Sequence, residues 1–208
     1  TQTKFGDAAL ALNMITSHDL QEALSSQFDF QYLKNKKDIS SDLVAAYDPY
    51  CAQTEAYRLL RTQLLLRCFD GSSNLVAIVP SDIQSNGAMI ASNLAIVFSQ
   101  LGNNTLIIDA DMTESPIMKL FGLNISAGLS NCLAQRTTTE ESIVKIDGFD
   151  DLSVLFAGSK PPNPQELLSK TEFSALLNKL VAQYDIILVN SAAIGERSDA
   201  SLISTRCK

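Results

Sequence analysis

The stretch that decides the fold is LVAIVPSDIQSNGAMIASNLAIVFSQLGNNTLIIDAD, residues 75–111. An apolar run at residues 75–79 leads into a polar turn and then into a segment with the periodicity of a helix. A second apolar run ends in Asp109-Ala110-Asp111. Short continuous apolar runs are typical of parallel strands that are buried on both faces. The stretch therefore predicts a strand, a crossover helix and a second parallel strand.

The same patterns continue along the chain. Strands are expected near residues 75–80, 105–109, 152–157 and 185–190, and helices at 87–101, 140–145 and 171–183, with shorter ones at 116–121 and 127–134. A further helix is expected from Glu55 to about Cys68, with an apolar face formed by Leu59, Leu60, Leu64 and Leu65. Alternating strands and helices predict an α/β fold with a doubly wound, mostly parallel sheet.

The first part of the chain has a different pattern. We expect residues 1–47 to form a small helical N-terminal segment with a linker, and residues 48–208 to form the α/β domain. Thr16 or Ser17 is a suitable N-cap for the second of two short helices. The polar stretch at residues 34–38 is typical of a linker or an exposed turn.

Composition excludes several classes of partner. The net charge of −7 and the pI near 4.7 disfavour nucleic acid and anionic lipid surfaces, which attract basic proteins. No run of about 18 apolar residues occurs, so direct membrane insertion is not expected. Without a secretory signal pattern, a cytoplasmic location is expected. Four widely spaced cysteines and a single histidine predict no metal site.

The turn at residues 84–89 lies where a phosphate-binding P-loop would lie. In the pattern G-x-x-x-x-G-K-[ST], backbone N–H groups surround the phosphates, lysine adds charge and the hydroxyl binds Mg²⁺. Aligned on Asn93-Leu94-Ala95, the lysine position is Gly87 and the hydroxyl position is Ala88.

This degenerate loop leaves two interpretations of its residues. The N–H groups at the start of a helix still favour an anion, so the candidate nucleotide-binding residues are Ser85, Asn86, Gly87, Ala88 and Met89. The alternative is an ordinary helix cap with Ser85 or Asn86 at the N-cap. The acidic chain and the missing lysine favour the cap.

Several ordered blocks together resemble one family. They are Glu55-Ala-Tyr-Arg58-Leu-Leu-Arg61, Ser92-Asn-Leu-Ala, Leu106-Ile-Ile-Asp-Ala-Asp111, Gly128-Leu-Ser130, Ala157-Gly-Ser-Lys-Pro-Pro-Asn-Pro-Gln-Glu-Leu-Leu168 and Tyr184-Asp-Ile-Ile-Leu-Val-Asn190. From about residue 48 to 203 the chain resembles the bacterial tyrosine kinases of exopolysaccharide and capsule biosynthesis, a MinD-like branch of the P-loop ATPases. Its likeness is to the chain-length-determinant kinases of the EpsG type. Because that family continues into further strands and a helix, we expect a truncation after Lys208 or a missing sheet edge.

The resemblance implies roles for the acidic residues and also shows what has changed. Asp109 and Asp111 match the Asp-x-Asp of the kinases, whereas Thr113 stands at the arginine position and Asn190 at the next acidic position. These losses predict a kinase-like protein without catalysis, a pseudokinase, for which no cofactor is expected. The alternative is an active ATP-dependent protein-tyrosine kinase that uses Mg-ATP with Asp109 and Asp111 as catalytic residues. The two carboxylates have a further alternative role, in which they cap loops.

The resemblance also implies partners. In these kinases a Glu-x-x-Arg-x-x-Arg helix packs between subunits, which nominates Glu55, Arg58 and Arg61 as an interface of a homo-oligomer. The alternative is a solvated face with pairing inside the helix. A membrane-embedded chain-length co-polymerase of the exopolysaccharide system is the implied partner, and it would hold the cytoplasmic protein at the inner membrane.

The N-terminal segment has a second, separate likeness. Lys4-Phe5-Gly6 followed by Leu20 and Gln27 is similar to the N-terminal domain of type II secretion ATPases, some of which bind cyclic di-GMP through paired repeats. Only one copy of the motif is present here. Lys4, Gly6, Leu20 and Gln27 are the candidate cyclic-di-GMP residues, and a small helical docking unit is the favoured alternative.

Overall fold

The protein forms two compact units, Thr1–Gln31 and Tyr32–Lys208. The computed structural model describes residues 5–16, 19–20, 23, 31–33, 39–69, 73–82, 84–194 and 199–206. The division falls earlier than the boundary at residues 47 and 48 expected from the sequence. Leu43, Ala45 and Ala46 are fully buried in the core of the second unit, and the Leu33 N–H donates to the Ala46 carbonyl at 2.7 Å. Burial therefore assigns these residues to the α/β unit.

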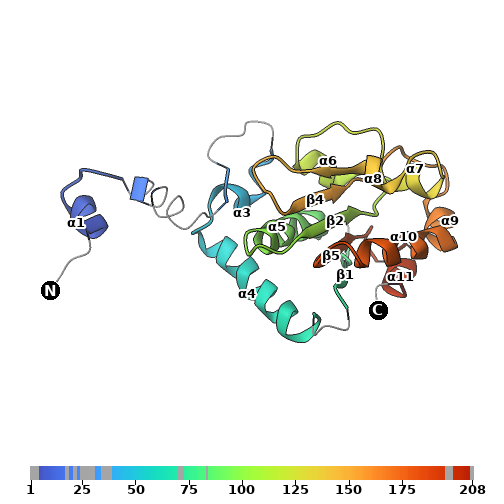
Figure 1. Cartoon of the computed structure of the whole chain (residues 1–208), viewed down its shortest axis with the longest axis horizontal. Helices are drawn as coiled ribbons and strands as arrows, with labels where there is room; N and C mark the ends of the chain where they lie inside the picture. Colours follow the sequence, from blue (N-terminus) through green and yellow to red (C-terminus); the bar gives the residue numbers. More distant parts are fainter. Residues whose placement is uncertain are drawn as a thin grey trace. The chain divides into compact units, whose positions relative to one another are not determined.

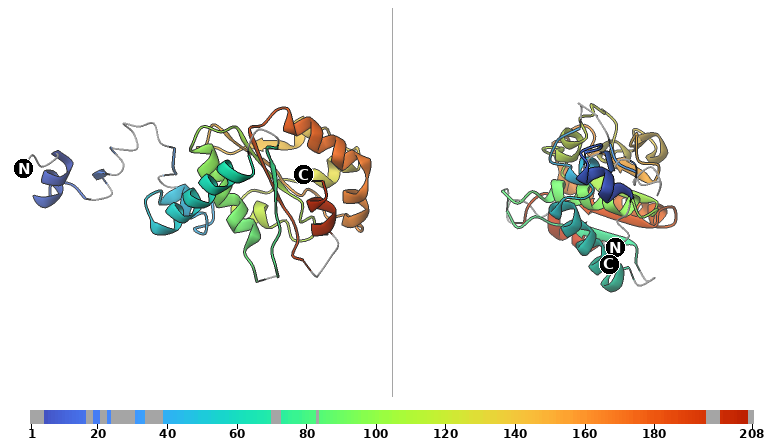
Figure 2. Two further views of the ribbon diagram at one scale, coloured as in Figure 1. Left: turned by 90° about the horizontal axis from the view of Figure 1, so that it is seen from below. Right: turned by 90° about the vertical axis from the view of Figure 1, so that its left-hand side faces the viewer.

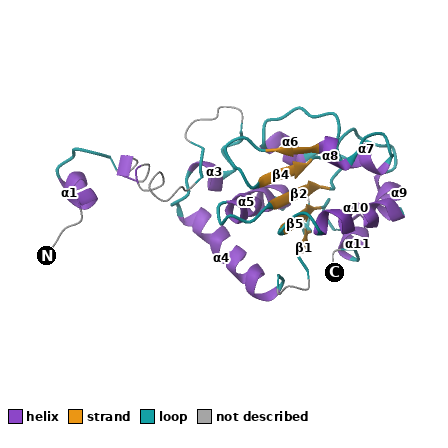
Figure 3. Ribbon diagram, viewed as in Figure 1, coloured by secondary structure: helices purple, strands orange, loops and turns teal. Residues whose placement is uncertain are grey.

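The second unit is built on one five-stranded sheet (Figures 1 and 3). The strand order is β1-β5-β2-β4-β3, in which the first four strands are parallel and β3 runs antiparallel to β4. The strands are β1 (Leu75–Ile78), β2 (Thr105–Asp109), β3 (Ile143–Lys145), β4 (Leu152–Leu155) and β5 (Ile186–Asn190). The predicted mostly parallel α/β sheet is confirmed.

Helices cover both faces of the sheet, as a doubly wound fold requires (Figure 2, left). One face packs against α3 (Val44–Tyr47), α4 (Ala52–Arg67), α5 (Gly87–Ser99) and α6 (Pro116–Leu120). The other packs against α7 (Leu129–Leu133), α9 (Pro164–Ser169), α10 (Thr171–Val181) and α11 (Asp199–Ser204). Among the described residues, no helix combines the length and apolarity needed to cross a membrane.

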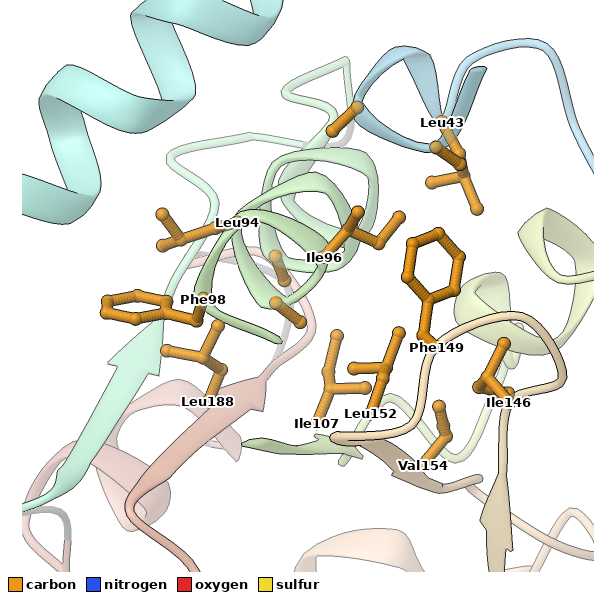
Figure 4. Close-up of a cluster of buried hydrophobic side chains, with 14 of the residues drawn as sticks. Leu43, Leu94, Ile96, Phe98, Ile107, Ile146, Phe149, Leu152, Val154 and Leu188 are labelled. Carbon is orange, nitrogen blue, oxygen red and sulfur yellow. The ribbon is translucent and has the colours of Figure 1, made fainter. Parts of the chain in front are cut away.

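Two separate cores follow from the alternation of side chains along each strand. Ile107, Val154 and Leu188 belong to one cluster with Leu94 and Phe98 of α5, in which Leu188 lies beside Phe98 and Val154 lies near Ile146 (Figure 4). The neighbouring strand residues, among them Leu106, Ile108 and Val189, pack on the opposite side against α10. Because both faces are apolar, each strand sequence is a continuous apolar run. This double burial holds the carboxyl ends of β1, β5 and β2 in register.

One expected helix was wrong, and α9 is a helix that was not expected. The helix expected at residues 140–145 is a single capped turn, α8 (Thr139–Ser142), followed directly by β3. The Thr138–Glu141 capping box starts this turn, and the β-branched Ile143 and Val144 then continue as an edge strand. Helix α9 was missed in the sequence, although Pro164 at its start is a usual helix signal.

Helix α4 also buries a different face from the one expected. Its buried residues are Thr54 and Tyr57, whereas Leu59 and Leu60 are 62% and 41% exposed. Leu64 and Leu65 are partly buried against the core, so only half of the expected apolar face packs inside the unit.

The N-terminal unit is described in part. Helix α1 (Phe5–Ala11) ends in a Schellman motif, in which the Met14 N–H donates to the Ala9 carbonyl and Asn13 has a positive φ of 53°. Thr16 and Asp19 exchange hydrogen bonds in the way of a helix N-cap. A Cβ atom on Gly6 would lie 2.6 Å from Leu20 Cδ1, so the two residues are packed together. Lys4 and Gln27 lie outside the described residues.

Candidate functional site

A cleft of about 810 Å³ opens at the carboxyl ends of β1, β5 and β2. Its lining includes all the candidate loop residues from Ser85 to Met89, together with Asp111 and Asn190. Asp109 is not part of the lining and is completely buried. The structure therefore brings the sequence-predicted residues to one place, at the edge of the sheet where such folds bind ligands.

In the loop after β1, the Asp82 carboxylate accepts a backbone N–H group of the same loop. The Asp82 carboxylate accepts the Ser85 N–H through Oδ1 at 2.8 Å and the Ser81 hydroxyl through Oδ2 at 3.1 Å. Hydrogen bonds from Ser85 and Ser81 hold the pKa of the Asp82 carboxyl below its usual range. A phosphate-binding loop aims such N–H groups at a phosphate. Here the N–H group of Ser85 is already satisfied by a side chain of the protein.

Gly87 is packed too closely for any side chain. A Cβ atom there would lie 2.3 Å from Pro80 Cγ, far inside van der Waals contact. The Gly87 N–H donates to the Ser85 carbonyl at 2.8 Å, and Asn86 makes no side-chain capping bond. Asn86 is the N-cap residue of α5, but its side chain does not make the capping hydrogen bond that was one of the two expectations. Pro80 therefore occupies the space that a lysine side chain would need at residue 87, the position aligned with the P-loop lysine.

Asp109 forms the buried centre beneath the cleft. Its Oδ1 accepts the Asn190 amide at 3.1 Å and the Asp111 N–H at 3.3 Å, and its Oδ2 accepts the Ile117 N–H at 3.2 Å. Burial raises the pKa of the Asp109 carboxyl to about 7, against the lowering effect of the hydrogen bond from Asn190. The carboxyl joins the ends of β2 and β5 to the start of α6.

Asp111 caps the turn that follows β2. Its Oδ1 accepts the N–H groups of Thr113 at 3.1 Å and Glu114 at 3.4 Å. Both contacts use the same oxygen, and the residue lies at the surface of the cleft. The loop-capping role considered for Asp109 and Asp111 is thus realised in their contacts.

Asn190, which the sequence resemblance predicts at an acidic position, has one side-chain atom without a hydrogen-bond partner among the described residues. It is 1% exposed, and its amide group donates to Asp109. A second carboxylate at this position would repel Asp109 and could not donate to it. The Asn190 Oδ1 atom is buried without a hydrogen-bond partner among the described residues. Buried polar atoms are nearly always satisfied, so an unpaired acceptor beside a cleft is unusual.

Asn93 was missed as a residue that shapes the cleft. Its Oδ1 accepts the Ala45 N–H at 2.9 Å, while its amide donates to the carbonyls of Asp42 at 2.9 Å and Met89 at 3.0 Å. The side chain is fully buried and joins the segment before α3 to the first turn of α5. A buried Asn in an apolar helix is the signal that could have identified it.

The Glu55, Arg58 and Arg61 triplet lies outside this cleft. Arg58 pairs with Glu55 at 3.2 Å along α4. Arg61 reaches across to α5, where its guanidinium donates to the Val97 carbonyl at 2.5 Å. Arg61 therefore satisfies a carbonyl near the end of α5, while Glu55 is exposed and Arg58 is partly buried.

Several curated proteins are similar to most of this chain. The CapB protein of Staphylococcus aureus is 31% identical over 82% of this chain and 74% of its own length. The tyrosine-protein kinase YwqD of Bacillus subtilis is 30% identical over 78% of this chain and 68% of its own length. This chain belongs to the bacterial tyrosine-protein kinase family. It spans only 25% of the tyrosine-protein kinase Wzc of Salmonella typhi, and no protein-family model matches it.

Solved structures of the kinase family have the same fold. The kinase domain of Escherichia coli ETK superposes with a TM-score of 0.77 at 29% identity, over 84% of this chain and 67% of that one. The chimeric protein CapA2B2 gives 0.76 at 28% identity, over 89% and 81%. The septum-site protein MinD of Pyrococcus horikoshii gives 0.56 at 19% identity, over 65% and 55%, which shows the P-loop type of fold alone.

The donor set of this cleft does not match the one that a P-loop uses for Mg-ATP. A P-loop needs a lysine, a hydroxyl and free N–H groups. The corresponding residues here are Gly87 and Ala88, and the Ser85 N–H is bound to Asp82. Asn190 adds an amide where a second carboxylate would help to hold the metal. The residues present therefore do not fit a magnesium nucleotide.

Proposed function

We propose that this chain is a regulatory, kinase-like protein of exopolysaccharide biosynthesis and polysaccharide chain-length control that does not transfer phosphoryl groups. The observation that carries the proposal is the closed loop, in which Asp82 occupies the Ser85 N–H and Pro80 fills the space beside Gly87. Phosphoryl transfer depends on positioning and charge neutralisation of the transferred group. Removal of one electrostatic contact alone costs about 3 kcal/mol of transition-state stabilisation.

The pathway assignment rests on the family. The relatives include kinases of capsule systems, such as a protein of the cps region of Klebsiella pneumoniae that is 34% identical over 81% of this chain. A chain that keeps the fold and loses the phosphate-binding groups is suited to bind partners. The partner proposed here is a membrane chain-length co-polymerase, which would place the protein at the cytoplasmic face of the inner membrane.

Helix α4 is the surface proposed for self-association. The exposed Glu55 and the partly buried Arg58 lie on the same helix as the exposed side chains of Leu59, Leu60 and Leu66. Exposed apolar residues next to charged ones are typical of protein interfaces. Light scattering of the wild-type protein and of Leu59→Ser tests this part, with an oligomer expected only for the wild type. A monomeric wild type would contradict it.

The deciding experiment for the function is titration calorimetry with ATP and ADP, each with and without Mg²⁺. No binding is expected at high micromolar nucleotide, and CapB serves as the matched comparison protein. Binding that requires Mg²⁺ would instead favour the alternative of an active tyrosine kinase. In that case, phosphotyrosine should disappear in Asp111→Ala.

The N-terminal unit supports a separate candidate, a regulator that binds cyclic di-GMP. The observation in its favour is the close packing of Gly6 against Leu20, two of the four motif residues. Calorimetry with cyclic di-GMP tests this candidate. Binding that is lost in Gly6→Val would support it, whereas absence of binding would leave a docking unit.

A further inference from the structure

The cleft is lined by acidic side chains. Among the described residues of the lining, Asp42, Asp82, Asp111 and Glu114 carry negative charge, and Lys119 is the one basic residue. Lys119 is already paired with Glu114 at 3.3 Å. With four acidic residues and one basic residue, the described lining is net negative, and such a cleft attracts ligands of the opposite sign. An anionic nucleotide or sugar phosphate is therefore a poor fit.

A second, independent feature also requires a hydrogen-bond donor. Asn190 lines the cleft and is 1% exposed, yet its Oδ1 has no partner among the described residues. Its amide hydrogens are directed to Asp109, so the unused atom is an acceptor. Asp111 uses Oδ1 for both of its backbone contacts. The Asn190 acceptor suits an N–H or O–H donor, and the acidic lining favours a donor that carries positive charge.

The arrangement favours an extended organic cation over a metal ion. In the described part of the chain, no three His, Cys, Asp or Glu side chains converge on a point where a metal could bind. The acids come from three separate segments, before α3, after β1 and after β2, around a cleft of about 810 Å³. Met89, Pro116 and Leu120 add apolar lining. Arginine combines an apolar stem with a planar set of donors that matches carboxylates.

We propose that this cleft binds an arginine-containing peptide segment of a protein partner, with guanidinium groups on the acidic lining. The inference rests on the proposed function, because a cleft that held nucleotide would not be available. In this assignment Asp111 holds one guanidinium group, and Glu114 adds negative charge beside it while it stays paired with Lys119. Asp82 and Asp42 favour a second basic residue. The former nucleotide site thus becomes a peptide-docking site.

The test uses the full chain and a capped hexapeptide of alternating arginine and glycine, which carries three positive charges. Binding is followed by titration calorimetry at about 20 mM and about 300 mM salt, because screening weakens ionic contacts at high salt. The expected result is binding that weakens with salt, with no binding of the glutamate–glycine peptide. Spermidine, which also carries three positive charges, should bind more weakly than the arginine peptide.

Matched variants separate a specific cleft from a general effect of charge. Asp111→Asn with Glu114→Gln removes two charges from the lining while the side chains keep a hydrogen-bond acceptor. This pair should weaken the arginine peptide by about tenfold. Glu166→Gln with Glu172→Gln removes two charges outside the lining and should change affinity by less than about twofold.

Three results would overturn the inference: no binding of the arginine peptide, equal loss in both pairs of variants, or spermidine binding as tight as that of the peptide. A parallel Mg-ATP titration distinguishes the two failures. Micromolar binding of Mg-ATP overturns the proposed function as well. If neither Mg-ATP nor the peptide binds, only the peptide site is overturned.

Discussion

Asp82 follows β1 and Asp109 ends β2 at the same edge of the sheet, yet the two carboxyl groups differ in burial and in the direction of their pKa shift. Asp82 is exposed, and hydrogen bonds lower the pKa of its carboxyl. Asp109 is completely buried, and loss of hydration raises the pKa of its carboxyl to about 7. The Asp82 carboxylate accepts a backbone N–H of its own loop, whereas the Asp109 carboxyl accepts hydrogen bonds from Asn190 at the end of β5 and from Ile117 in α6. The comparison shows that an acidic residue at this edge can be structural in two different ways.

The largest expected effect is the dependence of stability on pH that Asp109 causes. The pKa of its carboxyl is about 7 in the folded protein and about 3.9 in an unfolded chain. Its contribution to stability is therefore fully present below the lower value and is lost as the pH rises through about 7. The difference between the two pKa values corresponds to about 4 kcal/mol.

This pH dependence is measured as the free energy of unfolding in urea between about pH 4.5 and about pH 8. Asp109→Asn serves as the reference, because subtraction removes the titration of all other groups. The difference between the two proteins should change in favour of the Asp109→Asn variant as the pH rises. Parallel curves would show that the carboxyl titrates normally, and the contrast with Asp82 would disappear.

Removal of the Asp109 carboxyl is the next largest effect. Asp109→Ala leaves the Ile117 N–H and the Asn190 amide without their acceptor in a buried place. A loss of roughly 3 kcal/mol in the free energy of unfolding is expected near pH 6, because unsatisfied buried donors are costly. The matched change Asp82→Ala removes an exposed carboxylate and should have a far smaller effect on unfolding. Equal losses of unfolding free energy in Asp109→Ala and Asp82→Ala would contradict the distinction between a buried and an exposed carboxyl group.

Restoring the lysine tests whether geometry or charge alone separates this loop from a P-loop. Gly87→Lys should lower the free energy of unfolding by about 2 kcal/mol, because its Cβ meets Pro80. Gly87→Ala, which has the same Cβ without the charge, should lose a similar amount. Neither variant should gain Mg-ATP binding in calorimetry. Tight Mg-ATP binding by Gly87→Lys would show that the missing charge was the main obstacle.

The sheet and the position of the site could be predicted because they depend on local patterns. Residues 105–109 and 186–190 are buried throughout, and such strands produce continuous apolar runs in the sequence. The strand ends then place Asp109, Asp111 and Asn190 at one edge. Strand β3 was mistaken for helix, since three residues beside a capped turn carry almost no periodic signal.

The contacts that decide the chemistry could not be predicted, because they depend on the closed form of one turn and on helix packing. The role of Asp82 requires the turn to return Ser85 toward the carboxylate. The contact of Arg61 with the Val97 carbonyl requires α4 to cross α5 at that point. Leu59 is apolar and still exposed, because α4 packs through Tyr57. Tertiary packing, rather than residue type, selects these contacts.

The smallest expected effect concerns Asp82 itself. Asp82→Ala frees the Ser85 N–H and removes a negative charge from the loop before the N-terminus of α5. Inorganic phosphate should therefore bind this variant a few-fold more tightly than the wild type. Titration by NMR, with the Ser85 amide as the reporter, measures this change. Asp82→Asn is the matched control, since its side-chain oxygen can still accept the Ser85 N–H while the charge is gone.

If phosphate affinity rises equally in both variants, charge repulsion alone excludes anions. A rise only in Asp82→Ala identifies occupancy of the Ser85 N–H group as the cause. Unchanged binding in both would show that the loop excludes phosphate by its shape, and Asp82 would then differ from Asp109 only in hydration.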